Sequence, residues 1–191
     1  MIANFLRPPQ NSAEWIADLL RALGLASIFI AAIGWSVTDA GTLALALPAL
    51  LVPRSLGVRA WFDILYVVMV LAAAWSNVLG LYEAVPWWDL LLHFACSGVL
   101  AAMLYLALAA FGIVPRPPAG AGGARVPIVI VTSLGLALSS IWEMVEWFGR
   151  EFISSEIFVG YQDTIADMAL GGLGALAASV LVAFVPLLRF P

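Results

Sequence analysis

PWWDLLLHFACSGVLAAMLYLALAAFGIV, residues 86–114, is the stretch that decides the fold. Asp89 is its only charged residue and His93 its only imidazole. A helix needs about 20 predominantly apolar residues to cross a bilayer, because lipid offers no hydrogen bonds to unpaired backbone groups. This stretch exceeds that length, and it therefore predicts a membrane-spanning helix.

Five further apolar runs lie on both sides of this stretch and read the same way. Together they predict an all-α protein, a polytopic transmembrane bundle of six helices in a single domain covering residues 1–191. The five further helices are expected near Ile16–Val37, Ala40–Pro53, Trp61–Tyr82, Val126–Phe148 and Thr164–Leu188.

The composition supports a membrane protein and excludes other classes. Hydrophobic residues make up 64% of the chain and charged residues 10%, far from the averages of soluble domains. All 8 basic residues are arginines, and against 12 acidic ones they leave a net charge of −4. A basic face for nucleic acid is therefore absent. Cys96 is the only cysteine, so one chain can build neither a disulfide nor a thiolate metal cluster.

The arginines predict the orientation. Arginines occur at the N-terminus, in every second loop and at the C-terminus, whereas the remaining loops contain a single arginine, Arg150. The positive-inside rule therefore places both termini in the cytoplasm. The same alternation requires the short, proline-containing run 40–53 to cross fully. The arginines assigned to the cytoplasmic side are Arg7, Arg54, Arg59, Arg116, Arg125 and Arg189.

Charged residues near the predicted cytoplasmic ends are expected to neutralise one another. Arg21 follows Asp18 by three positions on one helical face, and Asp63 is expected to pair with Arg59. Glu14 and Asp18 also stand where a secretory signal carries basic residues, so the first helix is expected to be retained.

Six ionisable side chains gather at the predicted outer ends of the last three helices. Spacings of three and four residues put each pair on one helical face. Carboxylates crowded in a low dielectric need protons, water or a cation to balance their charge. We therefore predict a shared site with Glu146 and Glu143 as catalytic residues. The predicted metal ligands are Asp89, His93, Glu143, Asp163 and Asp167.

Three of these residues also have a structural alternative. Asp163 can serve as a helix N-cap, Asp89 can complement a helix dipole, and Glu146 can pair with Arg150 four residues later. The other three lie about a turn deeper than capping residues, which favours a functional role. They are His93, Glu143 and Asp167.

Small residues crowd the middle of the last predicted helix, from Gly171 to Ala178. Such a run lets neighbouring helices approach closely. Phosphate binding needs exposed amides at a helix start, so we expect this run to serve packing.

Three motifs in the second half of the chain resemble a known family. They are D-x-x-x-H-F from Asp89, E-x-x-E-W from Glu143, and G-x-Q-D-x-x-x-D-M-A-L from Gly160. The segment from Trp87 to Ala178 thereby resembles the YjdF-like family of small bacterial inner-membrane proteins and, more distantly, the VanZ-like proteins. The resemblance implies a multi-pass protein of the bacterial inner (plasma) membrane that shares these polar positions. It implies no particular reaction.

The leading functional hypothesis is a metal-assisted enzyme acting on a lipid or lipid-linked substrate at the outer leaflet. Carboxylates with one imidazole suit Mg²⁺, Mn²⁺, Zn²⁺ or Fe²⁺. Asp89 would orient His93 and Glu146 would serve as the general base. Membrane lipid is the expected partner, and nucleic acid is not.

Two other hypotheses remain open at this level. The cluster can be structural in a non-catalytic subunit or scaffold of a larger membrane complex, or of a homo-oligomer. The acids can also belong to a proton- or cation-coupled carrier. A carrier is less favoured, because no matching polar group lies in the cytoplasmic half of these helices and no inverted repeat is evident.

Overall fold

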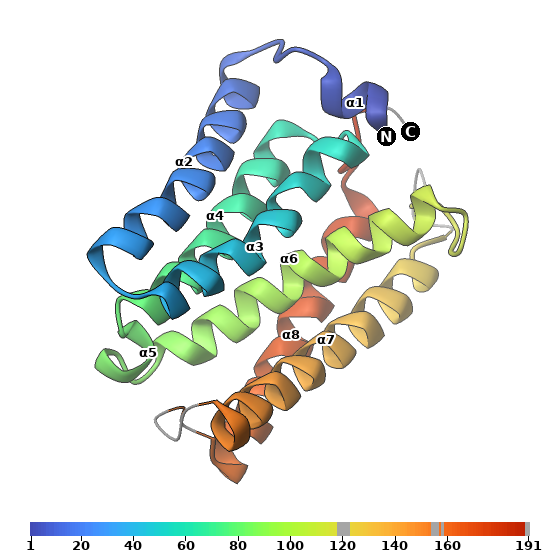
Figure 1. Ribbon diagram of the computed structural model, residues 1–191. Coiled ribbons are helices and arrows are strands. Elements are labelled where there is room, and N and C mark those ends of the chain that lie inside the picture. Colours follow the sequence, from blue (N-terminus) through green and yellow to red (C-terminus); the bar gives the residue numbers. More distant parts are fainter. Residues whose placement is uncertain (118–122, 154–156, 158, 190–191) are drawn as a thin grey trace. The chain divides into compact units, whose positions relative to one another are not determined.

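The computed structural model describes residues 1–117, 123–153, 157 and 159–189. In this part of the chain, 6 helices are long and apolar enough to cross a membrane (Figure 1). The predicted all-α, multi-pass fold is thus confirmed. The long helices are α2 (Ser12–Gly34), α3 (Val37–Leu56), α4 (Ala60–Val78), α6 (Trp88–Ala110), α7 (Arg125–Phe152) and α8 (Tyr161–Phe184). Two short helices not foreseen from the sequence are α1 (Ile2–Leu6) and α5 (Leu81–Ala84).

Helix α3 is longer than the segment predicted from the sequence. Ser36 caps its start by accepting a hydrogen bond from the Asp39 amide at 3.1 Å. Gly57 ends it in the left-handed region with φ of 72°, a conformation that glycine adopts without a steric penalty. Pro48 and Pro53 lie inside the helix and do not end it. The caps, rather than the prolines, therefore set a length of 20 residues, enough for a span.

Other helix ends also differ from the prediction. Helix α4 stops at Val78, and Gly80, at φ of 65°, separates it from α5. Helix α8 begins earlier than predicted, after an extended Gly160. Asp163 consequently lies in the first turn and is not the N-cap, so that structural alternative was wrong.

The chain divides into two compact units. Unit 1 comprises Met1–Pro86 together with Pro186–Pro191, and unit 2 comprises Trp87–Val185. Unit 1 thus contains α1 to α5, and unit 2 contains α6, α7 and α8. Each unit is described by itself below, and the single domain expected from the sequence stays a prediction.

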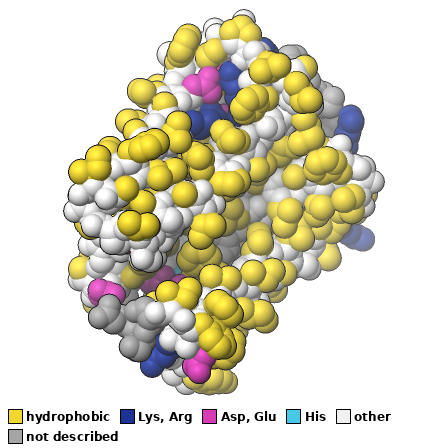
Figure 2. Space-filling view, in the orientation of Figure 1, with side chains coloured by type: hydrophobic (Ala, Val, Ile, Leu, Met, Phe, Trp, Pro, Cys, Tyr) yellow, Lys and Arg dark blue, Asp and Glu magenta, His cyan; other side chains and the backbone are white. Residues whose placement is uncertain are grey.

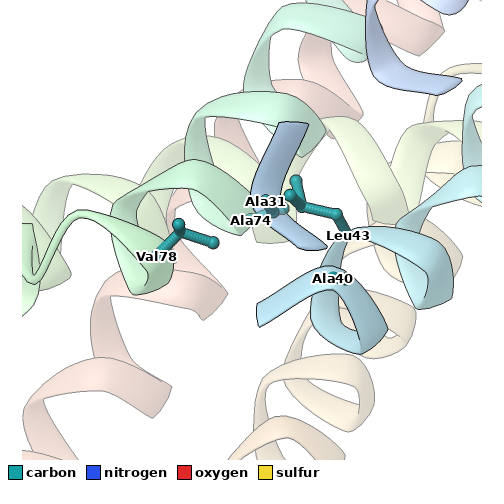
Figure 3. Close-up of a cluster of buried hydrophobic side chains, with 5 residues drawn as sticks. All are labelled: Ala31, Ala40, Leu43, Ala74 and Val78. Atoms are coloured by element: carbon teal, nitrogen blue, oxygen red, sulfur yellow. The ribbon is translucent and has the colours of Figure 1, made fainter. Parts of the chain in front are cut away.

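Small side chains form the core of unit 1 where α2, α3 and α4 meet. Figure 3 shows this cluster, to which the three helices contribute five residues. Alanines predominate in it, so the helix backbones can approach closely. Beside it, the Trp75 indole donates a hydrogen bond to Ser27 Oγ at 3.0 Å, which links α4 to α2. The clustered residues are Ala31, Ala40, Leu43, Ala74 and Val78.

Buried charges in unit 1 are paired across helices. Arg21 contacts Asp18 at 3.0 Å, as predicted, and also donates to the Leu50 carbonyl. The expected partner of Asp63 was wrong, because Asp63 pairs with Arg21 instead of Arg59. The Asp63 carboxylate is buried between helices, where an unpaired charge costs several kcal/mol. Pairing with Arg21 removes much of that cost.

The segment after α8 returns to unit 1 as an extended strap. Its Leu187 carbonyl accepts from the Arg59 amide at 2.7 Å, and the Arg189 amide donates to the Gly57 carbonyl at 3.0 Å. The Arg189 guanidinium reaches Glu14 at 2.9 Å, and Arg7 pairs with the same carboxylate. Both ends of the chain therefore meet at the start of α2.

Glycines in α8 set the packing of unit 2. A Cβ at Gly174 would lie 1.8 Å from the Phe94 carbonyl oxygen of α6. On the α7 side, a Cβ at Gly135 would lie 2.0 Å from the Cβ of Ala175. Only helices without side chains at these points can approach so closely. This confirms that the small residues of α8 serve packing.

Much of the face shown in Figure 2 is apolar. Large apolar side chains such as Phe29 and Ile33 are 64% and 88% exposed. Water would disfavour so much exposed apolar area, whereas lipid solvates it without cost. The surface therefore agrees with a multi-pass membrane protein.

Candidate functional site

The six ionisable side chains predicted to converge lie at one end of unit 2. Asp89 and His93 lie near the start of α6, and Asp163 and Asp167 near the start of α8. Helix α7 runs toward the same end and carries the other two acids near its C-terminus. All three helices pack against one another. The alternating direction of the helices thus gathers polar groups that are up to 78 positions apart in the sequence.

His93 is at the centre of the group. Its Nε2 lies 3.5 Å from Asp89 Oδ1, one turn earlier on α6, and 3.7 Å from Glu143 Oε1 on α7. Both separations are longer than an ordinary hydrogen bond. One imidazole nitrogen therefore faces carboxylates from two helices without forming an ordinary hydrogen bond to either.

Two sets of three side chains have the separations required around a cation. One is Asp89, His93 and Asp167, and the other is His93, Glu143 and Glu146. Within each set, one ligand atom per residue lies within 4.8 Å of the others. The structure thus brings together five of the predicted site residues in arrangements that could hold a metal ion.

Three carboxylate oxygens in these sets are buried without a hydrogen-bond partner. They are both side-chain oxygens of Asp167 and Oε1 of Glu143. Asp167 is 1% exposed and Glu143 6% exposed, so bulk water does not solvate them. A buried polar group without a partner is costly, and the cost is greater when it carries charge. These oxygens therefore need a proton, an ordered water molecule or a cation.

Glu146 is held by a residue that sequence reasoning missed. The indole Nε1 of Trp142 donates to Glu146 Oε1 at 2.7 Å. The predicted pair with Arg150 was wrong, because Arg150 donates to the Ile157 carbonyl at 3.1 Å. Trp142 precedes Glu146 by four positions on the same helical face, so the spacing could have revealed it.

Asp163 contributes charge without joining either set. It interacts electrostatically with Asp89, Glu143 and Asp167, which places it at the edge of the group. It is only partly buried. Its predicted role as a metal ligand therefore stays a prediction.

Two hydroxyl residues that were not predicted as ligands help to place the acids. Ser139 of α7 donates to the backbone carbonyl of Asp167 at 3.3 Å, a link between α7 and α8. Thr164 of α8 is within hydrogen-bonding reach of the Glu143 carboxylate. Gly171, one turn beyond Asp167, lets the Ser139 hydroxyl approach, since a Cβ there would lie 2.5 Å from Ser139 Oγ.

The side chains of the group differ in how deeply they are buried. His93, Glu143 and Asp167 are buried, whereas Asp89 and Glu146 are partly exposed. A site of this kind has a fixed interior set of ligands and an accessible rim. The rim is where a further molecule could meet a bound ion.

Comparison with known proteins identifies a family but no characterised relative. A family model described as "Predicted membrane protein (DUF2238)" matches residues 13–186, a range that includes all six long helices' cores and every residue of the site. No curated protein matches the chain. No solved structure matches it either. Because the matched range covers most of the sequence, the chain belongs to the DUF2238 family of predicted membrane proteins.

Proposed function

We propose that this protein is a metal-dependent membrane enzyme that hydrolyses a lipid or lipid-linked substrate, with its active site at one end of unit 2. The observation that carries this proposal is the Asp167 carboxylate. It is 1% exposed, neither of its oxygens has a hydrogen-bond partner, and it lies in a ligand set with His93 and Asp89. A divalent cation bound there supplies the missing interactions for both oxygens.

The donor set indicates which cations are suitable. Carboxylate oxygens with a single imidazole suit Mg²⁺, Mn²⁺, Fe²⁺ or Zn²⁺, and the absence of thiolate ligands disfavours soft metals. In this proposal Asp167 and His93 bind the ion and Asp89 completes the set from the partly exposed rim, while Glu143 approaches it from the overlapping set that shares His93. A divalent ion also neutralises part of the charge of five neighbouring carboxylates.

Glu146 is proposed as the general base. It is partly exposed, lies beside His93 and Glu143, and accepts a hydrogen bond from Trp142. Glu146 would take a proton from a water molecule polarised by the ion, and the resulting hydroxide would attack an ester carbon or a phosphorus atom. The bond to the leaving oxygen then breaks, and Glu146 returns the proton to that oxygen. The products are an acid and an alcohol from an ester, or two phosphates from a diphosphate.

The surroundings support an amphipathic substrate. Trp142, Trp147 and Phe148 on the last turns of α7 are 48%, 53% and 52% exposed, which places large apolar surfaces beside the acids. A substrate with an acyl or isoprenoid chain could lie along these side chains while its polar end reaches the rim. With the orientation predicted from the arginines, this end of unit 2 faces the outer leaflet. The YjdF-like resemblance adds the bacterial inner membrane as the expected location.

The unpaired oxygens count against a purely structural cluster. A structural network is stable when each buried donor and acceptor has a partner, since breaking a buried pair costs about 3–5 kcal/mol. Here three acceptor oxygens lack one. A bound cation supplies these partners, whereas a scaffold role needs protons, ordered water or a partner chain to supply them.

The first experiment measures metal binding. Purified protein in detergent is treated with chelator and then titrated with Mn²⁺ by calorimetry, for the wild type, Asp167→Asn and the control Asp39→Asn. Asp39 lies in the first turn of α3 in unit 1 and belongs to neither ligand set. We expect saturable binding to the wild type and to Asp39→Asn, and none or much weaker binding to Asp167→Asn. Equal binding by all three proteins would contradict the proposal.

The second experiment tests hydrolysis. The protein is reconstituted in vesicles of phosphatidylethanolamine and phosphatidylglycerol that also carry an isoprenyl diphosphate. Products are followed by mass spectrometry with Mn²⁺ or with chelator. We expect product only with metal and none from Glu146→Gln. A metal-loaded protein that releases no product from any of these lipids would contradict hydrolysis of this substrate class.

A further inference from the structure

Charged side chains form a connected network at one end of unit 1, where α2 and α4 begin and α3 ends. The Asp18 carboxylate lies 3.0 Å from Arg21 Nη1 and 3.2 Å from Arg54 Nη2, so it links two guanidinium groups. Arg189 reaches the same end through the strap and contacts Glu14 at 2.9 Å. The network contains five arginines and three acids, namely Arg7, Arg21, Arg54, Arg59, Arg189, Glu14, Asp18 and Asp63.

Positive charge exceeds negative charge in this network. Five guanidinium groups face three carboxylates, which leaves an excess of two positive charges. The other two acids of unit 1 do not balance it, because Asp39 is in the first turn of α3, whose last turn carries Arg54, and Glu83 lies in α5 after the end of α4. Glu14 is 5% exposed and Arg54 7%, so water screens these charges poorly. An anion beside the accessible arginines is therefore favoured.

Two of the arginines have hydrogen-bond donors to spare. Arg59 is exposed and donates only through Nε, to the Leu188 carbonyl at 3.3 Å. Arg7 is partly exposed and contacts Glu14 through a single terminal nitrogen. Among the described residues, the other terminal nitrogens of both arginines have no partner, although a guanidinium offers five N–H donors. Arg21, by contrast, uses all three of its nitrogens within unit 1.

Tryptophans place this end of unit 1 at the level of lipid headgroups. Trp15 follows Glu14 directly and is 63% exposed, and Trp61 lies two residues after Arg59 and is 43% exposed. Exposed tryptophans are enriched at the boundary between hydrocarbon and water. The spare donors of Arg59 and the excess charge therefore lie where the phosphates of a bilayer are found.

We propose that this end of unit 1 binds the headgroup of an anionic phospholipid, with Arg59 and Arg7 donating to its phosphodiester oxygens. The planar fork of arginine suits phosphate oxygens, and the negative charge of the lipid offsets part of the excess. Basic groups between membrane helices are suited to such headgroups. With the orientation predicted from the arginines, the lipid belongs to the inner leaflet. The site is in unit 1 and is independent of the enzyme proposed for unit 2.

Lipid titration followed by native mass spectrometry tests this site. Delipidated protein in detergent is titrated with phosphatidylglycerol or with phosphatidylethanolamine of the same acyl chains. We expect one phosphatidylglycerol per chain, bound at least about tenfold more tightly, because the ammonium group of phosphatidylethanolamine cancels its phosphate charge. Equal affinities would overturn the proposal. Glycerol phosphate is titrated by calorimetry, and binding as tight as that of the lipid would identify a soluble phosphate ligand and overturn the lipid assignment.

Variants locate the bound lipid. Arg59→Gln and Arg7→Gln should each weaken phosphatidylglycerol binding about fivefold, the usual effect of one arginine near an anionic lipid. Arg59→Lys keeps the charge and should retain most of the affinity. Arg116→Gln is the matched control, because Arg116 is exposed and belongs to unit 2. Circular dichroism verifies the fold of each variant. Wild-type affinity in both glutamine variants of unit 1, or an equal loss in Arg116→Gln, would overturn the site.

Discussion

His93 on α6 and Glu143 on α7 face each other with Nε2 and Oε1 3.7 Å apart, a separation longer than a hydrogen bond. The two side chains are nevertheless both buried. Close opposition without a direct bond is the arrangement expected of two ligands that share a cation. It also makes the consequences of changing Glu143 predictable.

Glu143→Gln should barely change the stability of the metal-free protein. Glutamine keeps the shape of the side chain, and the oxygen that is lost had no hydrogen-bond partner. We expect a change within about 1 kcal/mol, the value of a typical hydrogen bond. Mn²⁺ at a hundred times its Kd should stabilise the wild type by about 2.7 kcal/mol and the variant by much less. Thermal unfolding in detergent, with and without Mn²⁺, measures both effects.

A structural role for Glu143 predicts the reverse pattern. The metal-free variant would then unfold at a clearly lower temperature, and Mn²⁺ would shift neither protein. Glu151→Gln serves as the matched control on the same helix. It should behave as the wild type in both conditions.

Trp142→Phe should lower turnover without removing metal. The indole holds Glu146 through a 2.7 Å hydrogen bond, and phenylalanine keeps the apolar surface but cannot donate. Loss of one orienting hydrogen bond is worth about 1.4 kcal/mol, or roughly a tenfold fall in kcat. Trp61→Phe is the control, since Trp61 lies in unit 1 and its ring packs against Phe62. Initial rates and Mn²⁺ content are measured for both, and equal rates would show that Trp142 does not position the base.

Gly174→Ala should disrupt unit 2. The added Cβ would lie 1.8 Å from the Phe94 carbonyl oxygen, and a backbone atom cannot move aside without displacing a helix. We expect a loss of at least about 3 kcal/mol, at the upper end of overpacking costs. Gly41→Ala is the control, because nothing lies within 4 Å of a Cβ at that position. It should be neutral or stabilising by about 0.5–1 kcal/mol. Thermal unfolding with equal effects for both would contradict the described packing of α8 on α6.

Asp63→Asn should destabilise unit 1. Asp63 is 2% exposed and pairs with Arg21, which would lose one of its two carboxylate partners. Removing one member of a buried pair costs about 3–5 kcal/mol. Arg21 keeps its ion pair with Asp18, which should hold the loss of stability near the lower end of this range. Asp39→Asn, with a lost surface interaction, should cost less than about 1 kcal/mol. The comparison is made by thermal unfolding, and similar losses would contradict a buried pair.

Labelling with a membrane-impermeant maleimide in intact cells tests the orientation. In a Cys96→Ser background, Glu83→Cys lies in a loop predicted to be outside, and Arg116→Cys in one predicted to be inside. We expect labelling of Glu83→Cys alone before permeabilisation and of both afterwards. The opposite pattern would place the acidic group at the cytoplasmic face and contradict the positive-inside argument.

The positions of the acids could be predicted because the topology of helices is a simple constraint. Once residues 86–114 were recognised as a span, the alternation of direction placed Asp89, Glu143 and Asp167 at one end. Spacings of three and four residues then put each pair on one face. Neither step requires knowledge of side-chain packing.

Pairing between distant segments could not be predicted in this way. The ion pair of Arg189 with Glu14 joins residues 175 positions apart, and the pair of Arg21 with Asp63 depends on which helix faces which. Local spacing favoured Arg59 as the partner of Asp63, and the contact between α2 and α4 prevailed. The extent of α3 was missed for a different reason. Pro48 argues for a short helix, and the caps at Ser36 and Gly57 outweigh it.

The return of the strap to unit 1 has a consequence for the order of synthesis and assembly. Residues 186–189 supply backbone partners to Gly57 and Arg59 and an ion pair to Glu14, yet they are translated after all of unit 2. Helices α1 to α5 must therefore wait in the bilayer with Glu14 and these backbone groups incompletely paired while α6, α7 and α8 are inserted. Nascent unit 1 should therefore be a better substrate for membrane quality-control proteases than the finished protein. Folding of unit 1 is complete only when the strap binds to it.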